Sequence, residues 1–200
     1  MPEETFLQIT RRTAIATATF VPLAALTAAA QTPATALSAD QLKTLEAFID
    51  RLCPKDENGP GAVEMGAATY IDRALAGALA AEKNAFAEGL AGVETLARST
   101  HNSAFADLTT GRRDELLTAM DTGAAAGFPN ARAFFNRVRR LTLEGMFGDP
   151  YYGGNKNFAG WDLIRYPGPR LATSADDQKM GVEIKPLHRS AYGSGADHGH

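Results

Sequence analysis

Apolar side chains recur at helical spacing through most of this chain, and that periodicity limits its fold more than any other feature. After Ser38, large apolar residues stand three or four positions apart, at Leu42, Leu45, Phe48, Ile49 and Leu52. Such spacing places one apolar stripe along a helix. No run of alternating, β-branched residues is long enough to indicate a strand. The sequence therefore predicts an all-α fold.

Turn-forming residues separate the helical segments. Ser38 and Gln41 resemble a capping box, and Pro54 ends the helix that they begin. A second helix is expected from about Val63. The Ala-rich stretch 76–81 leaves open whether this helix continues into the next one.

Two later helices have their own start signals. Thr109 or Thr110 can cap one of them, and Asn130 can cap the last one, which carries an apolar stripe of Phe, Val and Leu. We therefore expect a single compact domain of about five helices at residues 38–148, packed around a Phe/Leu core.

The character of the chain changes after Gly148. Residues 149–170 are rich in Gly, Pro, Asn and aromatic residues, and residues 171–200 form a polar tail that is expected to be unstructured in isolation. Asp149 is expected to cap the turn that follows the last helix. Aromatic side chains seek burial, so the 149–170 segment should lie on a surface of this chain or of another. We expect partner contacts at Tyr151, Tyr152, Asn155, Phe158, Trp161 and Tyr166, although Trp161 fits a core position equally well.

The N-terminus reads as an export signal. Arg11 and Arg12 are adjacent, and the mildly apolar stretch that follows them ends in small residues at Ala30. This pattern predicts a twin-arginine (Tat) signal peptide at residues 1–30, cleaved after Ala30 and followed by a linker at 31–37. Weak hydrophobicity and a central proline argue against a membrane-spanning helix. The sequence predicts export by the Tat pathway to the periplasm.

Composition narrows the classes of partner. The net charge is −3, with no basic block after the signal, so nucleic acid is excluded as a partner. Cys53 is the single cysteine, which rules out an internal disulfide. It is either a buried thiol or one half of an intersubunit disulfide.

Signatures of catalysis are missing from the sequence. It contains no G-x-S-x-G, H-E-x-x-H, C-x-x-C or P-loop motif, and no C-x-x-C-H haem motif. We predict no catalytic, cofactor-binding or metal-binding residue in this chain, so any haem or flavin should sit on another chain. The carboxylates near the 55–61 turn, Asp56 and Glu64, are interpreted as helix-end and surface charges, and Glu64 and Asp72 as one solvated helix face.

One block carries a resemblance to a known family. Residues 144–155 read Glu-Gly-Met-Phe-Gly-Asp-Pro-Tyr-Tyr-Gly-Gly-Asn, and Gly160-Trp161-Asp162 and Tyr166-Pro167-Gly168 follow. Together with the 52–64 turn and the twin arginines, this block resembles the gluconate 2-dehydrogenase subunit 3 family, over roughly residues 40–170.

The resemblance implies a function. Such chains are small, non-catalytic subunits of membrane-associated, FAD-dependent sugar or polyol dehydrogenases. Their implied partners are a large FAD-containing subunit of the glucose–methanol–choline type, a multihaem cytochrome c and the Tat translocase. The small subunit would carry the signal and escort the folded flavoprotein to the periplasmic face of the bacterial inner membrane. The alternative is an independent periplasmic enzyme or ligand-binding module that uses the Asp56/Glu64 turn or the aromatic segment.

Overall fold

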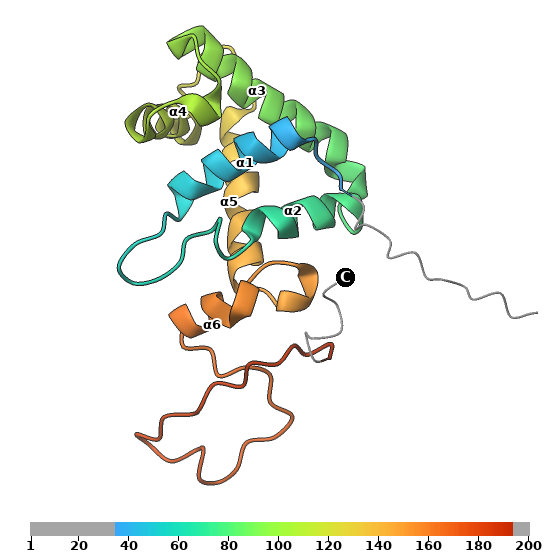
Figure 1. Cartoon of the computed structure of the whole chain (residues 1–200), viewed down its shortest axis with the longest axis vertical. Helices are drawn as coiled ribbons and strands as arrows, with labels where there is room; N and C mark the ends of the chain where they lie inside the picture. Colours follow the sequence, from blue (N-terminus) through green and yellow to red (C-terminus); the bar gives the residue numbers. More distant parts are fainter. Residues whose placement is uncertain (1–34, 194–200) are drawn as a thin grey trace, which may run out of the picture. The chain divides into compact units, whose positions relative to one another are not determined.

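The computed structural model describes residues 35–193 of the 200-residue chain. The twin arginines and the expected cleavage site at Ala30 lie outside these residues. The described part is all-α, as predicted, and contains no strand (Figure 1). Its helices are α1 (Ala39–Leu52), α2 (Ala67–Ala76), α3 (Lys83–His101), α4 (Thr110–Thr122), α5 (Ala131–Phe147) and the short α6 (Ala159–Leu163). No helix in this part of the chain is long and apolar enough to cross a membrane.

Local signals set the start of α1 but not that of α2. Ser38 and Gln41 form the predicted capping box, since each side chain bonds the other's backbone N–H. The predicted start of the second helix at Val63 is wrong, because Gly66 has a left-handed φ of 79° and α2 begins only after it. Gly77 and a 3₁₀ turn, Ala80–Glu82, separate α2 from α3, which answers the question that the Ala-rich stretch left open.

Helix α5 runs through the centre of the domain, behind α1 and α2 in the view of Figure 1. The core is the predicted Phe/Leu core. The ring of Phe48 lies 5.8–6.4 Å from those of Phe105, Phe134 and Phe135. Gly89 on α3 leaves room for Phe134, because a Cβ there would lie 2.2 Å from the phenylalanine ring. These contacts hold α5 in place, and the C-terminal end of α5 then positions the segment at residues 149–168.

The segment after α5 is more regular than the sequence suggested. It forms two 3₁₀ turns, Pro150–Tyr152 and Lys156–Phe158, and then α6. Beyond it, residues 169–186 form a wide excursion without a helix or strand (Figure 1). The chain then returns, and residues 187–193 lie against the 149–168 segment through backbone and ring contacts.

Candidate partner-binding surface

The Gly-Gly-Asn part of the block at residues 144–155 caps the C-terminal end of helix α5. The last carbonyls of a helix lack intrahelical partners and need others. Asn155, which is fully buried, supplies them: its backbone N–H donates to Gly145 O at 2.7 Å, and its side-chain Nδ2 donates to Gly148 O at 2.9 Å. Its Oδ1 accepts from Gly160 N at 2.8 Å, which ties α6 to the same residue.

The Gly-Trp part of the block completes this cap. Trp161 is only 5% exposed, and its indole Nε1 donates to Phe147 O at 2.9 Å. A Cβ at Gly154 would lie 2.0 Å from Gly145 O, and one at Gly160 would lie 1.9 Å from Met146 O, so both positions require glycine. Asn155 and Trp161 therefore face the interior of this chain and are not part of the candidate partner-binding surface.

Three of the six residues expected at a partner interface are exposed. Tyr151 and Tyr152 are each 45% exposed and Tyr166 is 39% exposed. Asp149 caps the turn before them, as predicted, since its Oδ1 accepts from Tyr151 N at 2.9 Å. The capped turn sets the rings of Tyr151 and Tyr152 in a T-shaped pair, 5.2 Å apart, at the surface. Phe158 is half-buried.

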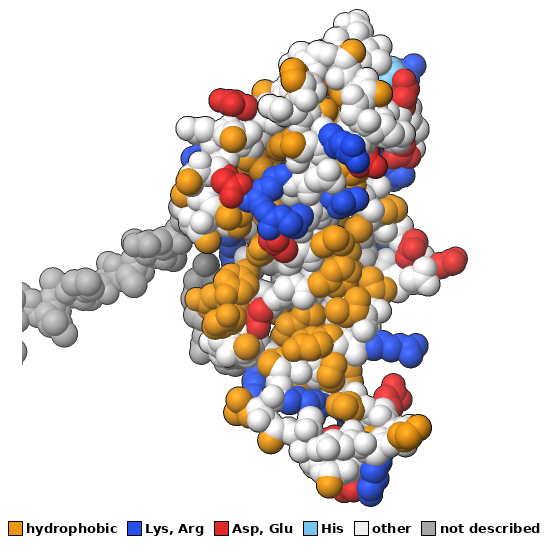
Figure 2. Space-filling view, turned by 180° about the vertical axis from the view of Figure 1, so that it is seen from behind, with side chains coloured by type: hydrophobic (Ala, Val, Ile, Leu, Met, Phe, Trp, Pro, Cys, Tyr) orange, Lys and Arg blue, Asp and Glu red, His pale blue; other side chains and the backbone are white. Residues whose placement is uncertain are grey.

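A groove of about 730 Å³ lies beside this tyrosine pair. It is lined by Tyr70, Arg73, Ala74, Gly77, Ala78, Leu79, Arg140, Glu144, Tyr151 and Tyr152. One polar cluster crosses it, in which Glu144 accepts from the Tyr70 hydroxyl at 3.0 Å and pairs with Arg140 at 2.8 Å. Burial and the Glu144 carboxylate raise the pKa of Tyr70 to about 12. Figure 2 shows hydrophobic side chains gathered across the middle of one face of the molecule, with Lys and Arg side chains beside them.

The carboxylates singled out in the sequence have structural partners. Asp56 accepts from the side chain and backbone N–H of Asn58, and these bonds lower its pKa. Glu64 accepts from Gly61 N at 3.1 Å. The solvated face predicted for Asp72 is wrong: this side chain is buried, and its Oδ1 accepts from both Ala36 N and Leu37 N at 2.8 Å, so it anchors the chain just before α1.

Cys53 lies at the end of α1 and is half-buried, and burial raises the pKa of its thiol. Its bridging to another subunit stays a prediction. Among residues 35–193, no group of three His, Cys, Asp or Glu side chains is placed to hold a metal ion.

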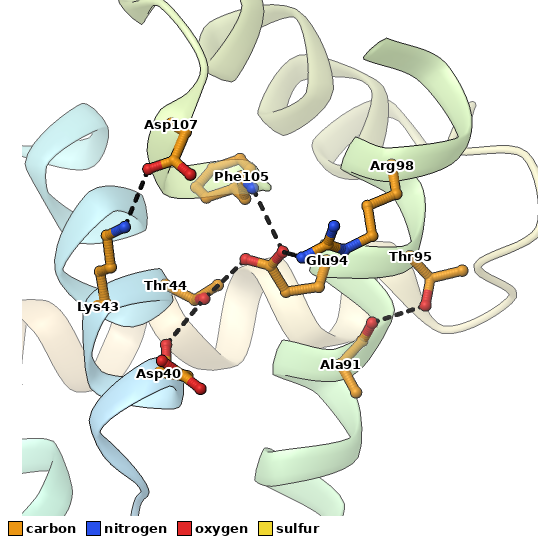
Figure 3. A network of polar contacts seen from close by, with 9 residues as sticks. All are labelled: Asp40, Lys43, Thr44, Ala91, Glu94, Thr95, Arg98, Phe105 and Asp107. Carbon is orange, nitrogen blue, oxygen red and sulfur yellow. Dashed lines mark hydrogen bonds and ion pairs between the residues drawn. The ribbon is translucent and has the colours of Figure 1, made fainter. Parts of the chain in front are cut away.

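A second polar cluster, which no sequence motif indicates, lies between α1, α3 and the 3₁₀ turn at Phe105–Asp107 (Figure 3). Glu94 accepts from Thr44 Oγ1 at 2.8 Å and from Phe105 N at 3.4 Å, and Arg98 lies 3.9 Å from it. Lys43 pairs with Asp107 at 2.9 Å. These bonds join three elements of the fold, and this structural role is enough to account for the cluster. A single Glu in the middle of a helix gives no sequence signal for it.

Fold and site together define a small helical domain with an exposed aromatic surface at the end of its central helix. The family model described as Gluconate 2-dehydrogenase subunit 3 matches residues 39–168, and the chain belongs to this family. The resemblance found in the sequence is thereby confirmed. Comparisons with curated proteins and with solved structures gave no match.

Proposed function

We propose that this chain is the non-catalytic small subunit of a periplasmic, FAD-dependent sugar or polyol dehydrogenase, and that it binds the flavoprotein through its tyrosine surface. The family, which is one of dehydrogenase subunits, supports membership in a multisubunit complex. The observation that carries the proposal is the exposed pair Tyr151 and Tyr152 at the rim of an open groove, inside the span that the family model matches.

Physical chemistry favours this surface as an interface. Tyrosine is enriched at protein–protein hot spots, because it offers a large apolar ring and a hydroxyl that can bond across the contact. Here Asp149 fixes the turn that carries both rings, so little conformational entropy remains to be lost on binding. The Arg140–Glu144 pair on the groove wall adds polar groups that a partner could complement.

The export signal extends the proposal. FAD is inserted in the cytoplasm and must stay bound in a folded chain, and the Tat route carries folded proteins. We propose that Arg11 and Arg12 direct both this chain and a large subunit without its own signal across the membrane. A multihaem cytochrome c would complete a heterotrimer at the periplasmic face of the inner membrane.

The first test is co-expression of the chain with a flavoprotein of the glucose–methanol–choline type that lacks its own signal. With this chain present, dehydrogenase activity is expected in the periplasm. With Arg11→Lys and Arg12→Lys in the same chain, both subunits should stay in the cytoplasm. Equal export and activity of the flavoprotein alone would refute the escort role.

The interface has its own test. The double variant Tyr151→Ala/Tyr152→Ala should lose co-purification with the flavoprotein, whereas Leu171→Ala, at a fully exposed position of the 169–186 excursion, should retain it. Non-reducing electrophoresis of the complex, with Cys53→Ser as the control, decides whether an intersubunit disulfide exists. Turnover of a substrate by the purified chain alone would favour the independent enzyme instead.

A further inference from the structure

The returning tail of this chain occupies the tyrosine surface. Residues 187–193, here called the clasp, begin where Leu187 N donates to Pro167 O at 2.9 Å. The ring of His188 then stacks on Phe158, at 5.0 Å and 3° between planes, and its Nε2 lies 2.7 Å from Asp162 Oδ1. The clasp thus crosses the same segment that holds the exposed aromatic residues.

Tyr192 brings the clasp onto the tyrosine pair itself. Its ring lies 5.0 Å from that of Tyr151 and 5.5 Å from that of Tyr152. Its hydrogen bond with the Tyr152 side chain raises the pKa of Tyr152. A second chain could not contact the parts of the two rings that Tyr192 covers.

The body of the domain is shaped to receive the clasp. Asp149 uses one carboxylate oxygen to cap the turn at Tyr151 N and the other to accept from Ala191 N at 2.8 Å. Gly168, with a φ of 82°, allows the close crossing, because a Cβ there would lie 2.2 Å from Leu187 O. Two independent features of the 149–168 segment therefore match the backbone of the clasp.

The clasp is nonetheless held only weakly on the 149–168 segment. Tyr192 remains 59% exposed, and the excursion that tethers the clasp carries fully exposed side chains such as Leu171 and Met180. Closing a flexible loop of this length opposes the clasp entropically. The family model ends at residue 168, so the seat lies inside the matched span and the clasp outside it.

We propose that the clasp is an intramolecular cover, which occupies the tyrosine surface in the uncomplexed chain and is displaced when a partner segment with an aromatic side chain docks there. The identity of that partner rests on the proposed function. The cover itself concerns this chain alone, so it can be tested without the partner.

The test uses a fluorescently labelled peptide of residues 186–193 and the mature chain ending at Lys185. A short flexible tether gives an effective concentration of roughly 1 mM, so a clasp closed about tenfold in its favour corresponds to binding in trans with a Kd on the order of 0.1 mM. The full-length chain should bind the peptide about tenfold more weakly, because its own clasp competes. Full-length Tyr192→Ala should recover the tighter binding, and Met180→Ala should not. Absence of binding to the shortened chain, or equal binding to both chains, overturns the proposal.

The flavoprotein supplies the second readout. The shortened chain should bind it about tenfold more tightly than the full-length chain, a difference of about 1.4 kcal/mol. Weaker binding of the shortened chain would make the clasp part of the interface and overturn its role as a cover. If neither chain binds the flavoprotein, the proposed function fails, while the peptide measurement still decides whether the clasp is a cover.

Discussion

Replacing Asn155 with Ala tests the idea that the sequence block at residues 144–155, which carries the family resemblance, caps helix α5. The change removes the side-chain bonds to Gly148 O and Gly160 N and leaves both backbone groups without a partner. It keeps the backbone N–H that serves Gly145 O. It therefore isolates the contribution of one buried amide side chain to the end of α5.

The magnitude follows from the geometry. Removing one partner of a hydrogen bond leaves the other partner unpaired, which costs about 1–3 kcal/mol for each of the two backbone groups. Asn155 also has a φ of 45°, and placing Ala in the left-handed region costs about 1 kcal/mol. For the two groups and the backbone term together, we expect Asn155→Ala to lower the free energy of unfolding by about 3–7 kcal/mol.

Asn157 is a matched control two positions away. It has a similar left-handed φ of 56°, but it is exposed, so Asn157→Ala should cost only the backbone part, about 1 kcal/mol. Urea unfolding of a chain that comprises residues 31–200, followed by circular dichroism and by the fluorescence of Trp161, measures both variants. If the two variants lose equal stability, the cap does not hold the end of α5 and the reasoning is refuted.

Three further outcomes test the rest of the structure. Gly89→Ala should destabilise the fold by about 1–3 kcal/mol, because its Cβ would meet the ring of Phe134. Gly111→Ala in α4 should instead stabilise the fold by about 0.5 kcal/mol, because no atom lies within 4 Å of the new Cβ. The midpoints of urea unfolding measure both changes. Asp72→Ala should release the residues before α1 and make limited proteolysis there faster, since the backbone amides of Ala36 and Leu37 lose their acceptor. The raised pKa of Tyr70 means that the folded state holds this proton more tightly than the unfolded state. Its contribution to stability is therefore present below pH 10 and is lost between about pH 10 and 12, and Tyr70→Phe should remove that part of the alkaline decline in urea-unfolding experiments.

Helices whose signals are local could be predicted from the sequence. The Ser38–Gln41 capping box and the apolar stripe of α1 need no knowledge of the rest of the chain, and both are present in the structure. The start of α2 could not be predicted in this way, because the apolar Val63 continues the helical period into a turn that Gly66 closes with a left-handed φ. Periodicity reports burial, and a buried turn satisfies it equally well.

The residues that depend on distant contacts were beyond sequence reasoning. Asp72 looked like a surface carboxylate because its hydrogen-bond donors, two backbone N–H groups, lie 35 and 36 positions away. Trp161 could be read as core or as interface because the deciding bond runs to Phe147 O, the carbonyl that α5 leaves unpaired where it ends. The hint available in the sequence was the glycines near Asn155, Gly153 and Gly154 before it and Gly160 after it, which indicate a close backbone approach before its partner is known.

The end of α5 therefore combines two tasks that a binding assay alone would confuse. Asn155 and Trp161 face inward and terminate the helix, whereas Tyr151 and Tyr152, on the turn between α5 and Asn155, face outward. Loss of partner binding in a variant of an inward residue reports a displaced turn and says nothing about contact. Loss of binding in a tyrosine variant that keeps the unfolding free energy of the parent reports the surface itself, because exposed rings can be truncated without opening the core. Evidence for the interface must come from the second kind of variant.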